Sequence, residues 1–146
     1  MAITQAVCDS FKVELLEGEH NFASAGGNTF KLALYTNAAT LSNTTTAFTA
    51  SNEVGDSGTY SSGGGTLTNQ GASGTGATAF IDFSDLSFTS ATISAQAAVI
   101  YNTNSTTNTN ASVMVLDFGA VKTSTSGTFT IQFPTADASD AILRIS

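Results

Sequence analysis

The chain has 146 residues, of which 41% are hydrophobic and only 10% are charged. This length and apolar content predict one domain, residues 1–146, with one hydrophobic core, and they argue against a disordered chain. A net charge of −7 with only four Lys and Arg residues argues against binding of duplex nucleic acid, which needs many cations. An acidic surface also disfavours anionic membranes, and no stretch reaches the roughly 18 apolar residues of a membrane span.

The chain contains one cysteine, Cys8, so no disulfide can form within it. The N-terminus has neither the basic start nor the long apolar run of a secretory signal peptide, so we expect synthesis in a cytosol. Asn-x-Ser/Thr sequons occur at Asn43, Asn104 and Asn110, as expected by chance in a chain so rich in these residue types.

The first predicted element is an amphipathic helix over residues 4–17. Apolar side chains recur at a helical spacing along one stripe, formed by Val7, Cys8, Phe11, Leu15 and Leu16. Thr4 is the expected N-cap, and Gly18 is the expected stop after the last turn. The stripe needs a partner, either within the fold or on a neighbouring subunit.

After residue 27 the hydrophobic period changes from near four to two, which predicts strands and long loops over residues 28–146. The predicted strands are residues 29–36, 47–50, 65–68, 77–83, 86–88, 93–101, 112–118, 127–133 and 141–145. Residues 93–101 and 112–118 are apolar on both sides, which is typical of strands buried on both faces. Long polar loops are predicted at residues 37–76 and 102–110.

Long helical crossovers between these strands are absent from the pattern, so we expect mostly antiparallel sheets. The predicted fold class is mainly β: an antiparallel β-sandwich, jelly-roll-like, with one N-terminal amphipathic helix. We expect the helix to cap an open end of the sandwich or a sheet edge.

The only histidine, His20, lies beside Glu17 and Glu19, just after the predicted helix. One imidazole and two carboxylates could bind a metal, but their spacing is not that of a helical or hairpin metal site. The favoured interpretation is a solvated helix end. Cys8 could be a nucleophile if a base lay nearby, but it belongs to the apolar stripe, which favours a role in the core.

Asp82, Asp85 and Asp117 are the carboxylates that could serve a glycosidase. Asp82 is expected on the outward face of its strand and Asp85 in a turn, and the chain has no Trp to form a sugar platform. Residues 63–66 (GGGT) resemble a phosphate loop only faintly, because the Lys and the following helix are missing. We therefore expect no enzymatic activity and no catalytic, cofactor-binding or metal-binding residues.

Segments spread over nearly the whole chain carry a resemblance to a known family. They are residues 10–12, 15–18, 20–22, 29–36 (TFKLALYT), 39–41, 52–54, 60, 63–67, 79–83 (AFIDF), 115–119 (VLDFG) and 127–134 (GTFTIQFP). Together they resemble small virion structural proteins of tailed bacteriophages, of the capsid decoration or cement type.

The resemblance implies a protein of the virion surface, assembled in the host cytoplasm, that binds the major capsid protein outside the head shell. A domain that binds only the mature lattice stabilises that lattice by linkage. The resemblance also implies self-association, as a homodimer or homotrimer, and no catalytic residues. We expect the N-terminal helix and the loops at residues 37–76 and 102–110 to make the contacts.

Two other functions are hypotheses from different classes. A tail or fibre component that recognises a host surface glycan would use the Asn-, Thr- and Ser-rich loop at residues 102–110, although the absence of Trp argues against it. A hydrolase would use Asp82, Asp85 and Asp117.

Overall fold

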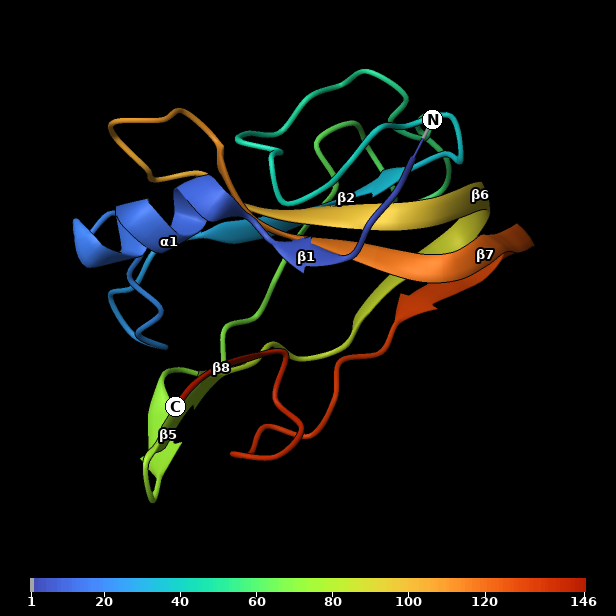
Figure 1. Ribbon diagram of the computed structural model, residues 1–146. Coiled ribbons are helices and arrows are strands. Elements are labelled where there is room, and N and C mark those ends of the chain that lie inside the picture. Colours follow the sequence, from blue (N-terminus) through green and yellow to red (C-terminus); the bar gives the residue numbers. More distant parts are fainter. Residues whose placement is uncertain (1) are drawn as a thin grey trace.

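Nine elements, eight strands and one helix, follow one another over residues 2–146, the part of the chain that the computed structural model describes (Figure 1). They are β1 (Ala6–Val7), α1 (Asp9–Leu16), β2 (Phe30–Tyr35), β3 (Gly65–Thr66), β4 (Ser73–Thr75), β5 (Thr78–Ile81), β6 (Leu86–Asn102), β7 (Ala111–Ile131) and β8 (Leu143–Ile145). Strands account for 46% of the structure and helix for 6%. No helix within these residues has the length and apolar character needed to cross a membrane.

The strands form two sheets whose ladders are all antiparallel. The larger sheet has five strands in the order β1-β7-β6-β2-β3, and the smaller has three in the order β4-β5-β8. The prediction of a mainly β protein with antiparallel sheets and a helix near the N-terminus is therefore confirmed at that level. Figure 1 shows the segment between β2 and β3 above the five-stranded sheet and the small sheet below it.

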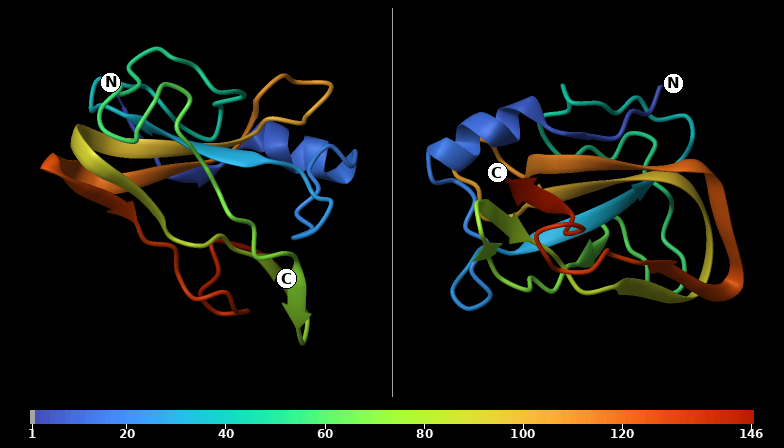
Figure 2. Two further views of the ribbon diagram at one scale, coloured as in Figure 1. Left: turned by 180° about the vertical axis from the view of Figure 1, so that it is seen from behind. Right: turned by 60° about the horizontal axis from the view of Figure 1, so that its bottom comes forward.

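One bent hairpin, made of β6 and β7, organises the larger sheet. These strands have 17 and 21 residues, so each joins two segments that the sequence predicts as separate short strands. Pairing is interrupted by register shifts between Phe88 and Ile93 and by positive φ angles at Ser90 (50°) and Ser126 (44°). Extra residues of this kind bend a strand, and both views in Figure 2 show the hairpin turning at this point.

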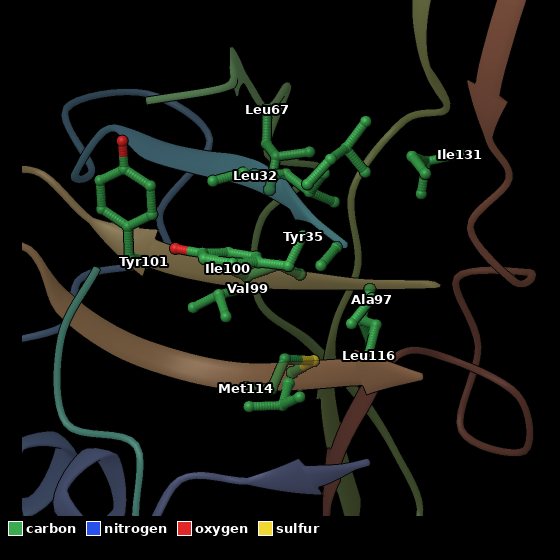
Figure 3. Close-up of a cluster of buried hydrophobic side chains, with 14 of the residues drawn as sticks. Leu32, Tyr35, Leu67, Ala97, Val99, Ile100, Tyr101, Met114, Leu116 and Ile131 are labelled. Atoms are coloured by element: carbon green, nitrogen blue, oxygen red, sulfur yellow. The ribbon is translucent and has the colours of Figure 1, made fainter. Parts of the chain in front are cut away.

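The core lies where β2, β6 and β7 run side by side. Leu32, Ile100 and Met114 are cross-strand neighbours in the ladder, and Figure 3 draws them within the buried cluster. Every residue from 97 to 102 is buried, whereas residues 86–95 of the same strand alternate between buried and exposed positions. The prediction that this strand is buried on both faces is confirmed for its C-terminal half.

The helix is shorter than predicted and begins at a different residue. Ala6 and Val7 pair with Val115 and Met114 of β7, and Cys8, not Thr4, is the N-cap of α1. The predicted start is wrong because the backbone N–H groups in this stretch donate to carbonyl groups far away in the chain, as Cys8 N–H does to Val113 O. The predicted stop is confirmed, since Gly18 adopts a φ of 81° directly after the helix.

The apolar stripe of the helix is also placed differently. Phe11 and Cys8 are buried as expected, but Leu16 is 91% exposed, while Glu14 is only 7% exposed. A buried carboxylate and an exposed leucine on one short helix mean that the helix does not simply bury its apolar face. The partner for Glu14 is described below.

The segment between β2 and β3 is fixed by the three tyrosines rather than by regular structure. The hydroxyl of Tyr35 donates to Thr49 O (2.6 Å) and that of Tyr101 to Gly63 O (2.6 Å). The hydroxyl of Tyr60 donates to Glu53 Oε1 (2.8 Å) and accepts the N–H of Leu34 (2.9 Å).

Within the predicted loop at residues 37–76, β3 and β4 are short strands, whereas the predicted strand at residues 47–50 is reduced to a single bridge between Ala47 and Ala111.

Gly64→Ala should destabilise the fold by about 2–4 kcal/mol. Gly64 has a φ of 79°, and an added Cβ would overlap the carbonyl group of Leu32 on β2. Gly76→Ala is the matched control, because Gly76 has a similar φ of 62° but open space around it, so only about 1 kcal/mol should be lost. Urea unfolding measures both, and equal losses would contradict the close approach to β2.

The tyrosines should resist ionisation until the protein unfolds. Burial raises the pKa of Tyr35 and Tyr60 and raises that of Tyr101 to about 12, from an ordinary value near 10. Stability from these groups is therefore complete below about pH 10 and is lost as the pH rises toward 12. Phenolate absorbance should appear together with loss of circular dichroism; phenolate appearing near pH 10 in folded protein would contradict the burial.

Candidate functional site

A buried polar cluster joins α1, the turn after it, the end of β6 and the loop that follows β6. Its members are Glu14, His20, Asn102 and Asn108. His20 Nε2 lies 2.9 Å from Glu14 Oε2, and His20 Nδ1 lies 3.0 Å from Asn102 Nδ2. Asn108 Nδ2 donates to the other carboxylate oxygen, Glu14 Oε1, at 2.9 Å. The cluster thus links segments more than 80 residues apart through side chains that are mostly hidden from solvent.

The geometry fixes the proton on the imidazole ring. An amide nitrogen only donates, so His20 Nδ1 is the acceptor for Asn102 and the ring proton sits on Nε2, facing Glu14. The ring packs against Phe11, at a centroid distance of 4.8 Å, and lies near Phe22 and Phe30. With both nitrogens engaged, the ring offers no lone pair to a substrate or a metal ion.

The loop at residues 103–110 is anchored to this cluster. Glu19 accepts hydrogen bonds from the N–H of Thr106 (2.7 Å) and from its hydroxyl (2.8 Å), and these contacts lower the pKa of the Glu19 carboxyl. Asn108 Nδ2 also donates to Thr46 O at 2.7 Å. The loop is therefore held in one shape by two carboxylates from the N-terminal segment.

Sequence reasoning placed His20 at a solvated helix end, and that is wrong, since it is only 6% exposed. Its carboxylate partner is Glu14 of α1, which lies three residues before Glu17 and five before Glu19, the two neighbours considered in the sequence. The only sequence signal for this pair was the carboxylate at position 14, beside the apolar stripe. Its contact with His20 could not be predicted without knowing that Asn102 lies next to the imidazole ring.

Cys8 is fully buried, as the stripe predicts, and burial raises the pKa of its thiol. The base it would need as a nucleophile is not supplied by His20, whose ring nitrogens are bound to Glu14 and Asn102. Cys8 is therefore a core residue and the N-cap of α1.

Asp82 was expected on the outward face of its strand, and this is wrong: it is 1% exposed. Its carboxylate accepts the N–H of Phe83 (2.8 Å) and that of Ile142 (3.4 Å), and burial raises its pKa. Asp85 accepts the N–H of Phe133 (2.8 Å). These two carboxylates join chain segments, which is a structural role.

Asp117 accepts the N–H of Gly119 (2.9 Å) within its own strand. The negative charges of Asp85 and Asp137 add to the effect of burial in raising the pKa of Asp82. Within residues 2–146, no three His, Cys, Asp or Glu side chains come together in a way that could hold a metal ion.

The glycines at positions 63–65 do not form a phosphate site. The N–H of Gly63 already donates to the carboxylate of Glu53 (2.6 Å), so an anion occupies the position that a phosphate would need. Gly64 and Gly65 pack closely against β2 and the Phe88 side chain. Gly65 belongs to β3, within the strand predicted at residues 65–68.

An open cleft of about 800 Å³ lies between the C-terminal end of α1, the turn after it and the three-stranded sheet. Apolar side chains form most of its wall, including Leu15, Phe22, Phe80, Ile81, Leu143 and Ile145. A second cleft of about 560 Å³ is lined from both sides of the bend in β7, by Leu116, Phe118, Phe129 and Ile131 among others. These clefts can receive apolar groups. His20 is the titratable residue in the lining of the first cleft, and Asp117 and Lys122 are those in the lining of the second.

Comparison with known proteins gives no match: no family, no curated protein and no solved structure is similar to this chain.

Asn108→Ala should cost about 1–3 kcal/mol of stability, because it removes hydrogen bonds to Glu14 and Thr46 and leaves a buried carboxylate oxygen without a donor. Amide exchange in residues 103–110 should rise at the same time. Thr109→Ala, at an exposed position in the same loop, is the control and should change neither quantity. Unchanged exchange in the Asn108 variant would show that the cluster does not hold the loop.

Asp82→Asn and Asp9→Asn should shift the pH dependence of stability in opposite directions. The pKa of Asp82 is raised, so its ionisable carboxyl stabilises the fold below about pH 3.8, and this gain is lost as the pH rises through its folded value. Hydrogen bonds from Lys12 and Asn43 lower the pKa of Asp9, so its gain is present above about pH 3.8 and is lost in acid.

The measurement is urea unfolding of each variant and the native chain across the acidic range. The stability difference, native minus variant, should fall with rising pH for Asp82 and rise for Asp9. If this difference changed with pH in the same direction for both residues, the pKa direction assigned to one of them would be wrong.

Proposed function

We propose that this chain is a structural virion protein of a tailed bacteriophage, a capsid decoration or cement protein that binds and stabilises the head shell. The observation that carries the proposal is the contrast between the reactive side chains and the exposed apolar ones. Groups that could do chemistry hold the backbone or each other, whereas large apolar side chains are left at the surface: Val13, Leu16, Val121 and Ile145. The sequence resemblance to small virion proteins supports the same role.

The proposed action is stabilisation by binding, without catalysis or a cofactor. Packaged DNA strains the lateral contacts between shell subunits, and a domain that binds only the mature lattice adds its binding free energy to that lattice. The partners are the major capsid protein and other copies of this chain, as a homodimer or homotrimer, on the outer capsid surface. Assembly takes place in the host cytoplasm, with no direct contact to nucleic acid or membrane.

A jelly-roll-like β-sandwich is part of the same proposal. Two features support it: the antiparallel pairing of all strand ladders and the bend that turns the ends of β6 and β7 toward the lower face of the large sheet. Such a domain presents strand edges and loops to neighbours around a rigid core.

The alternative function is a tail or fibre component that recognises a host surface glycan. One observation favours it: the loop at residues 103–110 is rich in hydroxyl and amide groups and is anchored by Glu19 and Asn108, so a binding surface there would be preorganised. Labelling the protein in intact virions separates the two roles. Many copies over the head support decoration, and a few copies at the tail support the alternative.

The decisive experiment mixes the purified chain with mature heads that lack it. We expect saturable binding, and heads that withstand heating or chelation better than untreated heads. Empty precursor shells are the control, because a protein specific for the mature lattice should leave them unbound. Absence of binding and of any gain in head stability would overturn the proposal.

A further inference from the structure

The outer edge of β7 has no strand beside it for most of its length. β7 pairs with β6 along one edge, whereas on the other edge β1 covers only Met114 and Val115 (Figure 1). The later part of the strand, residues 123–131, contains no charged residue and no proline. Charges and proline are common protection for a strand edge, so this edge is available to another chain.

The cleft of about 560 Å³ opens along this edge, and we name it the β7-edge cleft. Its lining includes the consecutive residues 116–118 before the bend and 128–132 after it. Because neighbouring residues of a strand point to opposite faces, a cleft lined by consecutive residues follows the edge of the strand rather than one face. The apolar residues of the lining are Leu116, Phe118, Phe129, Ile131 and Ile142.

The lining of the β7-edge cleft holds one acidic and one basic side chain, Asp117 and Lys122. In the ladder with β6, Asp117 lies opposite Ala97. Lys122 lies opposite Ala95, two residues away from Ala97 on β6, because the residues between Asp117 and Lys122 bulge out of the ladder. Opposed residues share a face, and so do residues two apart on one strand, so both charges lie on the same face of the sheet, separated by about 7 Å along it.

Both charged groups are available to a partner. The two ion pairs within residues 2–146 involve α1, so neither Asp117 nor Lys122 has an ionic partner in this part of the chain. Asp117 Oδ1 accepts the N–H of Gly119 at 2.9 Å, which leaves Oδ2 without a donor among the described residues. Lys122 is exposed, and its ammonium group forms no ion pair there. The cleft therefore presents one negative and one positive group side by side.

We propose that the β7-edge cleft is the surface through which two copies of this chain associate, about a two-fold axis that passes between Asp117 and Lys122. The carboxylate of Asp117 in each copy then binds the ammonium group of Lys122 in the other. The apolar lining of the two clefts is buried in the same contact and supplies affinity, while the charges set the register. This inference rests on the self-association that is part of the proposed function and adds the surface that makes it.

Charge complementarity favours a second copy as the occupant. A two-fold contact brings position 117 of one copy to position 122 of the other and the reverse, so one acid and one base give two ion pairs. The lining of the cleft has no net charge, although the whole chain carries −7, so the contact places no like charges opposite each other. Any other partner would need its own acid and base at a matching spacing, whereas a second copy always carries them.

Reversing one charge at a time tests the reciprocal pairing. Asp117→Lys leaves two positive groups in the cleft and Lys122→Asp leaves two negative ones, so each variant should dimerise roughly tenfold or more weakly than the native chain. An equal mixture of the two variants should recover the native affinity, because every Lys of one then faces an Asp of the other. Sedimentation equilibrium of the purified chains measures the dissociation constant, which added salt should raise for the native chain and for the mixture.

Asp140→Lys is the matched control, because this exposed residue undergoes the same charge reversal outside the cleft and should leave dimerisation unchanged. Melting temperatures show that each variant is folded, and recovery in the mixture shows it independently. A monomeric or trimeric native chain, single variants that dimerise like the native chain, or a mixture that does not recover would overturn the inference. Binding to mature heads is measured separately, so its failure would overturn the role at the head shell without touching the dimer contact.

Discussion

The pairing of β6 with β7 is the constraint on which the rest of the structure depends. This hairpin spans most of the large sheet. The C-terminal half of β6 pairs with β2 on one edge and β7 on the other, and it is buried on both faces. Burying a strand on both faces requires cover from both sides. The segment fixed by the three tyrosines supplies one cover, and the aromatic group around Phe22, Phe30 and Phe83 contributes to the other.

The polar cluster at Glu14 and His20 follows from the same constraint. The end of β6 places Asn102 inside the protein, where its amide must find partners, and the imidazole of His20, the amide oxygen of Asn28 and the carbonyl of Glu19 provide them. Glu14 must then turn inward to accept the proton of the ring. With its inner face occupied by Phe11 and this carboxylate, the short helix leaves Val13 and Leu16 outside. The exposed apolar face is thus a consequence of satisfying buried polar groups.

Much of the fold could be predicted from period and composition. Alternation over residues 30–35 and 127–131 marks strands, and the apolar run that ends at residue 101 marks a fully buried one. The polar residues in the bends of β6 and β7 interrupt the hydrophobic pattern, so the sequence predicts four short strands where the structure has two continuous ones. The candidate site was harder to predict from the sequence, because His20 and Asp82 were both expected at the surface and both are buried. Their burial depends on partners 82 and 60 residues away, Asn102 and Ile142, which local pattern does not reveal.

The sequence by itself determined the class of structure, because backbone pairing and the alternation of side chains are local properties of each strand. It also determined that charge is scarce and acidic, which limits the kinds of partner. The tertiary structure decided where the helix begins, which carboxylate meets the histidine and which leucine remains in solvent. Those outcomes depend on hydrogen bonds between distant segments of the chain. Each buried donor or acceptor needs a partner in the folded protein, and meeting that need overrode the helical pattern of the local sequence.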